Sequence, residues 1–243
     1  MINQFNAALK IRQLFDSESC TYTYLVWDER TKEAAIIDSV LEQRERDAQL
    51  IRELGLNMKY CMETHVHADH ITASGLLRQD FNTEIVLHKN SGVQCADILA
   101  DEGDVFRLGD QAIEILHTPG HTNNDITFKL DGAIMTGDTM LVRDCGRTDF
   151  QLGSTEKMHD SLSRLFSMPD DTVVLPAHDY KGFNMSTIGE EKKYNNRLGG
   201  GKSKEEFTEI MDNLNLPNPR KIDIAVPGNL RCGLPEDMEC DKS

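Results

Sequence analysis

The segment Thr64-His65-Val66-His67-Ala68-Asp69-His70 decides the fold, because it places three histidines and one aspartate within six residues. Residues 59–63 before it have the composition of a short β-strand, so the segment starts where that strand ends. Alternate side chains of an extended segment point the same way, so His65, His67 and Asp69 can share one face, and a turn brings His70 to them. Neutral imidazole is the commonest metal ligand in proteins, and four donors this close together predict a metal site.

Three further His or Asp residues also follow predicted strands. A lone residue of this kind is usually a turn or capping residue, but four strand ends that each supply His or Asp are how an α/β scaffold assembles a metal site. The three are His121 after a strand at 111–117, Asp138 after a strand at 133–136, and His178 after a strand at 172–175. The other histidines lack such neighbours and are expected to be structural or solvent-facing: His88, His117 and His159.

The rest of the chain alternates predicted strands and helices. β-Branched and aromatic runs predict strands at 21–27 and 34–38, and apolar residues at helical spacing predict a helix at 41–55. Ser154 is a good N-cap, and Thr187 with Glu190 and Ser203 with Glu206 match the capping-box spacing, so helices follow each of them. This order predicts an α/β protein whose sheets are covered by helices. We expect one domain over residues 1–243, with a short helical extension from about 187 and a flexible tail after 233.

Composition excludes several classes of protein. The chain has 26 basic and 41 acidic side chains, a net charge of −15, which argues against binding nucleic acid or an anionic membrane. No window approaches the 18 or so apolar residues of a spanning helix. Residues 1–6 lack signal or transit character, so we expect a cytoplasmic protein, although a mature mitochondrial matrix chain would look the same. The six cysteines form no Cys-x-x-Cys pair, and we expect no disulfide framework.

The ordered set of seven ligand-type residues resembles the signature of the metallo-β-lactamase superfamily. That signature is His-x-His-x-Asp-His followed by a His, an Asp and a last His, and it is matched here by His65, His67, Asp69, His70, His121, Asp138 and His178. The resemblance implies an αββα sandwich of two mixed β-sheets flanked by helices, with the site at one edge of the sheets. It does not by itself fix the reaction.

Two further segments resemble one branch of that superfamily, the persulfide dioxygenases. They are 144–151, which reads Asp-Cys-Gly-Arg-Thr-Asp-Phe-Gln, and 177–183; the segments 213–217 and 222–233 are similar as well. The resemblance implies oxidation of glutathione persulfide by O₂ and water to sulfite and glutathione, at one iron(II) per chain. His65, His121 and Asp138 would be the catalytic metal ligands, a facial triad that leaves positions open for substrate and O₂. His67, Asp69, His70 and His178 would orient them.

The anionic substrate needs a cationic contact in this acidic protein. Arg147 is the candidate, because its planar guanidinium suits a carboxylate, with Tyr180 and Lys181 beside it in sequence. The alternative for Arg147 is a structural ion pair with Asp149 or Asp144. The resemblance also suggests a homodimer and a functional link to a rhodanese.

Two other functions stay open. All seven ligands of a two-metal site are present, which by spacing favours a dinuclear thioester hydrolase of the glyoxalase II type with Asp138 as the bridge. The helices expected after Thr187 are few and short for the larger C-terminal domain of that class. The third reading is a redox sensor or sulfur carrier that acts through Cys145, whose thiol pKa a nearby Arg147 would lower.

Overall fold

Two six-stranded sheets form the centre of the protein in this computed structural model, which describes residues 8–238 and 240. In spatial order the first sheet consists of β1 (Leu9–Asp16), β2 (Thr21–Asp28), β3 (Glu33–Ile37), β4 (Asn57–Met62), β5 (Glu84–His88) and β6 (Ile98–Ala100). The second consists of β12 (Ser186–Thr187), β11 (Val173–Leu175), β10 (Ala133–Met135), β9 (Ile126–Leu130), β8 (Gln111–His117) and β7 (Val105–Leu108). Each sheet has parallel and antiparallel pairs, so both are mixed.

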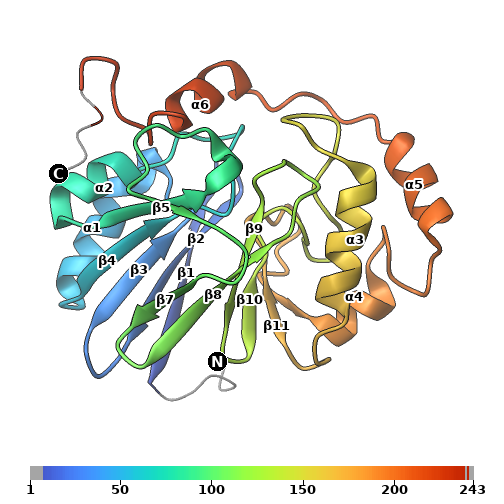
Figure 1. Cartoon of the computed structure of the whole chain (residues 1–243), viewed down its shortest axis with the longest axis horizontal. Coiled ribbons are helices and arrows are strands. Elements are labelled where there is room, and N and C mark those ends of the chain that lie inside the picture. Colours follow the sequence, from blue (N-terminus) through green and yellow to red (C-terminus); the bar gives the residue numbers. More distant parts are fainter. Residues whose placement is uncertain (1–7, 239, 241–243) are drawn as a thin grey trace.

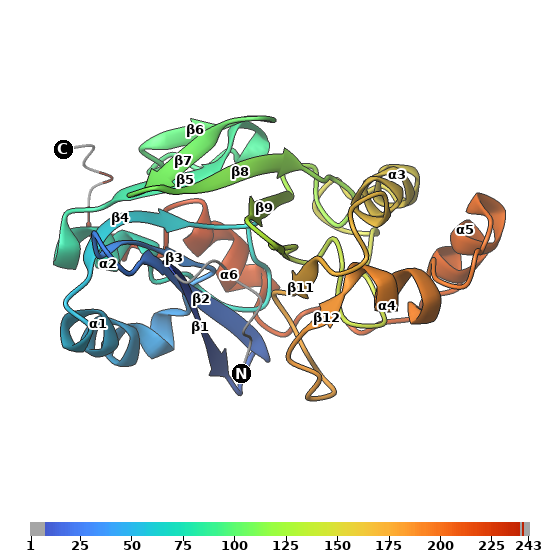
Figure 2. The same ribbon diagram turned by 90° about the horizontal axis from the view of Figure 1, so that it is seen from below.

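Helices cover the outer faces of both sheets (Figures 1 and 2). The first sheet is flanked by η1 (Leu41–Gln43), α1 (Arg44–Glu53), α2 (Ser74–Phe81) and, late in the chain, α6 (Ile222–Asn229). The second is flanked by α3 (Thr155–Phe166), α4 (Ile188–Tyr194) and α5 (Lys204–Asp212); the short helix η2 (Lys89–Ser91) follows β5. The layers therefore run helix, sheet, sheet, helix, which confirms the predicted αββα sandwich.

Alternation along the strands explains why the sheets are buried on both faces. In β2, Tyr24 and Val26 pack between the two sheets, while Leu25 and Trp27 pack toward the first helical layer. Because β2 is covered on both sides, both sets of its alternating side chains are buried, including those of Thr21 and Thr23. A third cluster joins the second sheet to α3, α4 and α5, and Phe207 of α5 is fully buried in it. The C-terminal helices thus share the core of the sheets.

Several elements match the sequence predictions and others do not. Ser154, Thr187 and Ser203 each accept a hydrogen bond from the backbone N–H three residues on, so all three predicted N-caps are confirmed. The strands β6 and β7 and the helix α6 were not predicted. In α6, Pro227 and Gly228 disfavour a helix locally, and burial of Ala225 and Asn229 in the fold overrides that preference.

Cys95 and Cys240 form a disulfide, with their Cα atoms 5.0 Å apart. The sequence analysis expected no disulfide framework and did not foresee this single bond, because a separation of 145 residues gives no pattern in the sequence. Leu234 is also buried, so the tail after residue 233 contacts the core at two points, while its flexibility stays a prediction. Among the described residues, no helix is long and apolar enough to cross a bilayer.

Candidate metal centre

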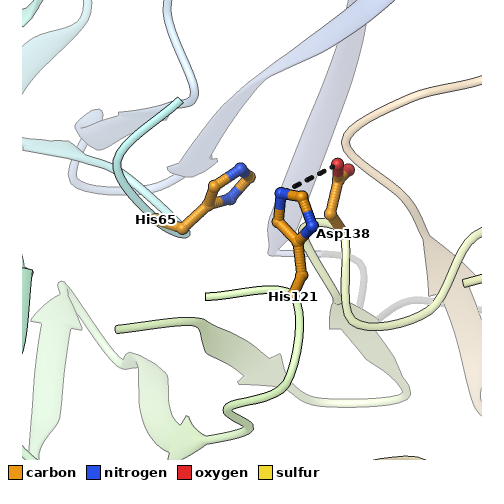
Figure 3. Close-up of side chains that lie close together, drawn as sticks. All are labelled: His65, His121 and Asp138. Carbon is orange, nitrogen blue, oxygen red and sulfur yellow. Dashed lines mark ion pairs between the residues drawn. The ribbon is translucent and has the colours of Figure 1, made fainter. Parts of the chain in front are cut away.

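Loops at the ends of four strands bring the predicted ligands together at one edge of the sheets. His65 follows β4, His121 follows β8, Asp138 follows β10 and His178 follows β11. One ligand atom from each of His65, His121 and Asp138 lies within 4.8 Å of the other two. Figure 3 shows the three side chains converging, with Nε2 of His121 3.6 Å from Oδ2 of Asp138. The predicted triad is thus assembled by the fold.

Hydrogen bonding fixes the tautomer of His121. Its Nδ1 lies 2.7 Å from the backbone carbonyl of Arg147, and a carbonyl can only accept, so Nδ1 carries the proton. Nε2 is then left with its lone pair toward the other two side chains, as a metal ligand requires. Burial, followed by the neighbouring His67 and His121, lowers the pKa of His65 well below the usual range for histidine. Both imidazoles are therefore suited to bind a cation.

His178 holds Asp138 from behind. Its Nδ1 lies 2.7 Å from Oδ1 of Asp138 and its Nε2 lies 2.9 Å from Oδ2 of Asp69, so the ring bridges two carboxylates. Burial disfavours the charged imidazolium, but the charges of Asp138 and Asp69 outweigh it and raise the pKa of His178 well above the ordinary value. In the same way burial would raise the pKa of Asp138, yet the positive charge of His178 holds it well below the usual range. Asp138 therefore stays an anionic ligand.

His67 is turned toward two other carboxylates. Its Nε2 lies 3.1 Å from Oδ1 of Asp38 and 3.3 Å from Oε2 of Glu63. Burial works against the charged ring, but these two neighbours prevail and raise the pKa of His67 to about 10. His67, Asp69 and His70 also offer atoms within 4.8 Å of one another. Nδ1 of His67 and Nε2 of His70 are buried with no hydrogen-bond partner among the described residues, and a second metal would use such atoms.

Three polar side chains that the sequence analysis did not single out hold the His-rich loop. Asn229 of α6 donates to the carbonyls of His67 (2.9 Å) and His70 (2.8 Å), and its Oδ1 accepts from the backbone N–H of Thr72 at 2.8 Å. Asp38, at the end of β3, accepts from the backbone N–H of Thr64 at 2.7 Å. Thr21 contacts His178, His70 and Asp69 at 3.1 to 3.3 Å. No local pattern marks these residues, because their partners are distant in sequence.

Two glycines allow the close packing around the triad. Gly137 has φ +54°, and a Cβ there would lie 2.8 Å from the side chain of Thr64, so both its conformation and the available space require glycine. A Cβ on Gly146 would lie 2.6 Å from the carbonyl oxygen of Asp138 and 3.0 Å from the ring of His121. The loop that carries Gly146 therefore presses directly on the two ligands.

The donor set fits a divalent transition metal. Two imidazole nitrogens and one carboxylate oxygen, converging from separate strand ends, form the 2-His-1-carboxylate arrangement that is typical of non-haem iron(II). The orienting hydrogen bonds to His121 and Asp138 are the outer-sphere contacts that such sites use.

A pocket of about 440 Å³ opens directly over this centre. Its lining includes His121, Asp138 and His178 of the candidate centre and the segment 216–220. The volume falls within the roughly 300–1,000 Å³ that is typical of small-molecule sites. The three predicted substrate residues, Arg147, Tyr180 and Lys181, all line it. The ring of Tyr180 stacks on that of His178, with centroids 6.0 Å apart.

Two residues behave differently from the sequence expectations. The guanidinium of Arg147 binds Asp149 at 2.6 and 2.7 Å, which is one of the two ion pairs considered as the alternative for it. The thiol of Cys145 is buried against Met211, and burial raises its pKa above the ordinary value. The expected lowering of this pKa was wrong, because burial and the negative charge of Asp144 outweigh the positive charge of Arg197. A reactive thiolate at Cys145 is therefore not supported.

The remaining histidines lie outside the centre. His88 and His117 stack with ring centroids 4.0 Å apart, and His159 contacts Asp160 on the surface of α3. None of the three takes part in a ligand group among the described residues.

Comparison with known proteins agrees with this architecture. Residues 20–178 match the family model described as the metallo-beta-lactamase superfamily. The human protein named "Persulfide dioxygenase ETHE1, mitochondrial" is 49% identical over 94% of this chain and 90% of its own length. The crystal structure of ETHE1 from Myxococcus xanthus has a TM-score of 0.90 and 52% identity, and the match covers 93% of this chain and 100% of that one.

More distant relatives carry other names. Glyoxylase B2 of Dictyostelium discoideum is 27% identical over 92% of this chain and 91% of its own length. The family model spans the whole set of strand-end ligand residues found here, from the residue before β2 to His178. The chain therefore belongs to the metallo-β-lactamase superfamily, and within it groups with proteins named persulfide dioxygenase.

Proposed function

We propose that the protein is an iron(II)-dependent persulfide dioxygenase that acts on glutathione persulfide. The balanced reaction takes one glutathione persulfide, one O₂ and one water to glutathione, sulfite and two protons. The observation that carries the proposal is the triad of His65, His121 and Asp138, of which His121 and Asp138 line an open pocket. The near-full-length similarity to proteins named persulfide dioxygenase supports it.

Iron(II), held by the triad, would supply the redox chemistry and adjacent open coordination positions for the two reactants. The chain's own residues prepare that centre. The Arg147 carbonyl fixes the direction of His121, and His178 keeps Asp138 ionised. Holding both reactants in one pocket removes much of the entropic barrier to their encounter.

The walls of the pocket position the substrate. Leu141 and Val142 contribute apolar surface to the pocket, and basic side chains line it as well. A persulfide whose peptide part is anionic would therefore be held by its carboxylates, with its sulfur end near the triad. Tyr180, stacked on His178, forms part of the same wall.

A second candidate function rests on one observation. The partnerless nitrogens of His67 and His70 could bind a second metal, with Asp138 as a bridge, as in thioester hydrolases of the glyoxalase II type. Such an enzyme would hydrolyse S-lactoylglutathione and consume no O₂. Nε2 of His67 is held by Asp38 and Glu63, which leaves Nδ1 as its ligand atom and does not separate the two functions. The near-full-length similarity to proteins named persulfide dioxygenase favours the first.

One experiment separates the two. Iron-reconstituted protein is given freshly prepared glutathione persulfide, while O₂ uptake, sulfite and metal content are measured on the same sample. Uptake with equimolar sulfite at about one iron per chain is the expected result. No uptake, together with about two metals per chain and hydrolysis of S-lactoylglutathione, would refute the proposal.

We also propose one domain for the whole chain, a homodimer, and a functional link to a rhodanese. The first is supported by the helices α4 and α5, which share a core with α3 and the second sheet. The other two rest on the family resemblance. A cytoplasmic or mitochondrial matrix location is proposed on the same basis, since the human and mouse relatives are named as mitochondrial.

A further inference from the structure

Four basic side chains line the pocket, but two of them are already neutralised. Arg147 is paired with Asp149, and Nε of Arg197 lies 2.5 Å from Oδ1 of Asp144. The other two are Lys181 and Arg220, both exposed. Within residues 8–238 and 240 neither side chain has an ion pair or a hydrogen bond. Lys181 and Arg220 are therefore the charges of this pocket that remain free for an anion.

Arg147 has a different task, because it holds the segment that leads to Arg220. Its Nη1 donates to the carbonyl of Pro217 at 2.7 Å, and its Nη2 lies 3.4 Å from the carbonyl of Leu216. The guanidinium also stacks on Phe150, 4.0 Å from the ring centroid. Since the carbonyl of the same residue orients His121, Arg147 links the segment 216–220 to the metal centre.

Lys181 reaches the pocket from another segment. It follows His178 in the loop after β11, where Oδ1 of Asp179 accepts the backbone N–H groups of Lys181 (2.8 Å) and Gly182 (3.0 Å). The turn that carries Lys181 is thus fixed by hydrogen bonds. Arg220 lies in the connection between α5 and α6. The two free cations therefore come from separate, anchored segments that line one pocket.

We propose that Arg220 and Lys181 each bind one of the two carboxylates of the glutathione part of the substrate, and that Arg147 is the positioning residue for Arg220. The inference rests on the proposed function for the identity of the ligand. Glutathione carries one carboxylate at its glycine end and one on its γ-glutamyl group, so two separate cations match its charges. Guanidinium and ammonium groups form the strongest hydrogen bonds of proteins with such partners.

Binding of S-methylglutathione, an unreactive analogue, to the iron-loaded protein tests the assignment by calorimetry. For Arg220→Gln we expect Kd to rise about tenfold, which is about 1.4 kcal/mol and near the lower end for a hydrogen bond to a charged group. Arg107→Gln is the matched control: Arg107 is an exposed arginine of β7 outside the pocket lining, so its loss changes the net charge equally. An unchanged Kd in Arg220→Gln, or an equal rise in Arg107→Gln, would overturn the assignment.

Esterified ligands identify the contact. Esterification of the carboxylate that Arg220 binds should raise the Kd of the wild type about tenfold. The Kd of Arg220→Gln should be the same for this ester as for the free acid. Lys181→Gln should show the same behaviour with the other carboxylate. If both variants lose equally with both monoesters, the two-carboxylate arrangement is wrong.

The role of Arg147 is tested by a double-mutant cycle with Arg147→Gln and Arg220→Gln. If Arg147 acts by placing Arg220, its substitution weakens binding in the wild type but adds little once Arg220 is gone. A merely structural role would give additive losses, and additive losses would overturn the positioning role.

Turnover separates this inference from the proposed function. With glutathione persulfide, Arg220→Gln should raise KM about tenfold and leave kcat unchanged, because the contact is made equally in ground and transition states. If the wild type binds S-methylglutathione in an Arg220-dependent way but takes up no O₂, the carboxylate contact stands and the dioxygenase function fails. If O₂ uptake is normal and Kd is insensitive to Arg220, the function stands and the contact fails.

Discussion

Replacement of His178 by glutamine tests how the protein holds Asp138, the proposed carboxylate ligand of the metal. The two ring nitrogens of His178 contact Asp138 at 2.7 Å and Asp69 at 2.9 Å. A glutamine amide is uncharged and carries both of its N–H donors on one nitrogen, so it does not reproduce this bridge. Asp138 then loses the neighbouring charge that keeps its pKa low. Loss of an outer-sphere partner of a metal ligand costs about 10–100-fold in metal affinity, and we expect the iron affinity of His178→Gln to fall by that factor.

The assay is a competition titration of apo protein with iron(II) and a chromophoric chelator under anaerobic conditions. His159→Gln is the matched control, since the ring of His159 contacts Asp160 and Phe207 and belongs to no ligand group of the described structure, and the chemical change is the same. An iron affinity within about twofold of the wild type would refute the reasoning about charge support. If the wild type binds about two metals per chain and His178→Gln binds about one, His178 is itself a ligand of a second metal, and the reasoning about charge support is wrong for that reason.

Three further outcomes are expected. Gly146→Ala should lower iron occupancy and destabilise the fold by about 1–3 kcal/mol, because its Cβ would overlap the carbonyl of Asp138. Metal analysis measures the occupancy and chemical unfolding measures the stability, and wild-type values of both would contradict the close approach. Cys145→Ala should keep most of kcat, since the thiol is buried and its pKa is raised; a collapse of turnover with folding intact would instead favour the sulfur-carrier reading. Hydrogen bonds, first from the backbone N–H of Thr31, lower the pKa of Asp28 to about 2. The ionised carboxylate therefore stabilises the fold at pH values above its unfolded pKa of about 3.9. This contribution to the free energy of unfolding is lost as the pH falls toward about 2. In Asp28→Asn the free energy of unfolding, measured in urea, should fall less steeply as the pH is lowered through this range. The same dependence on pH as in the wild type would contradict the assignment.

Much of the fold could be predicted because its elements have local signals. The strand β2 is rich in β-branched and aromatic residues, and the side chains of Ser154 and Ser203 cap the helices α3 and α5. The helix α6 could not be predicted, because Pro227 and Gly228 disfavour a helix locally and tertiary packing decides the outcome. The pairing of Cys95 with Cys240 likewise depends on contacts made only in the folded chain.

In the candidate metal centre, too, part of the arrangement could be predicted from the sequence and part could not. His65, His121 and Asp138 were predictable, because each stands at the end of a readable strand and the strand ends meet at one edge. The state of the residues around them was not. That His67 faces Asp38 and Glu63, and that Arg147 is occupied by Asp149, follows from side-chain orientations that spacing does not encode. Arg220 was missed because a single arginine in a loop carries no pattern.

The hydrogen bonds of Asn229 have a consequence for how the protein is made. They join α6 to the carbonyls of His67 and His70, across separations of 162 and 159 residues. A ribosome releases the His-rich loop long before it has synthesised Asn229. During most of translation the loop therefore lacks the hydrogen bonds of Asn229. We expect the nascent chain to bind iron weakly until α6 packs against the rest of the fold. Metal loading would then be a late event in biogenesis, and a chain cut short before α6 would have the ligands but not the means to keep them in place.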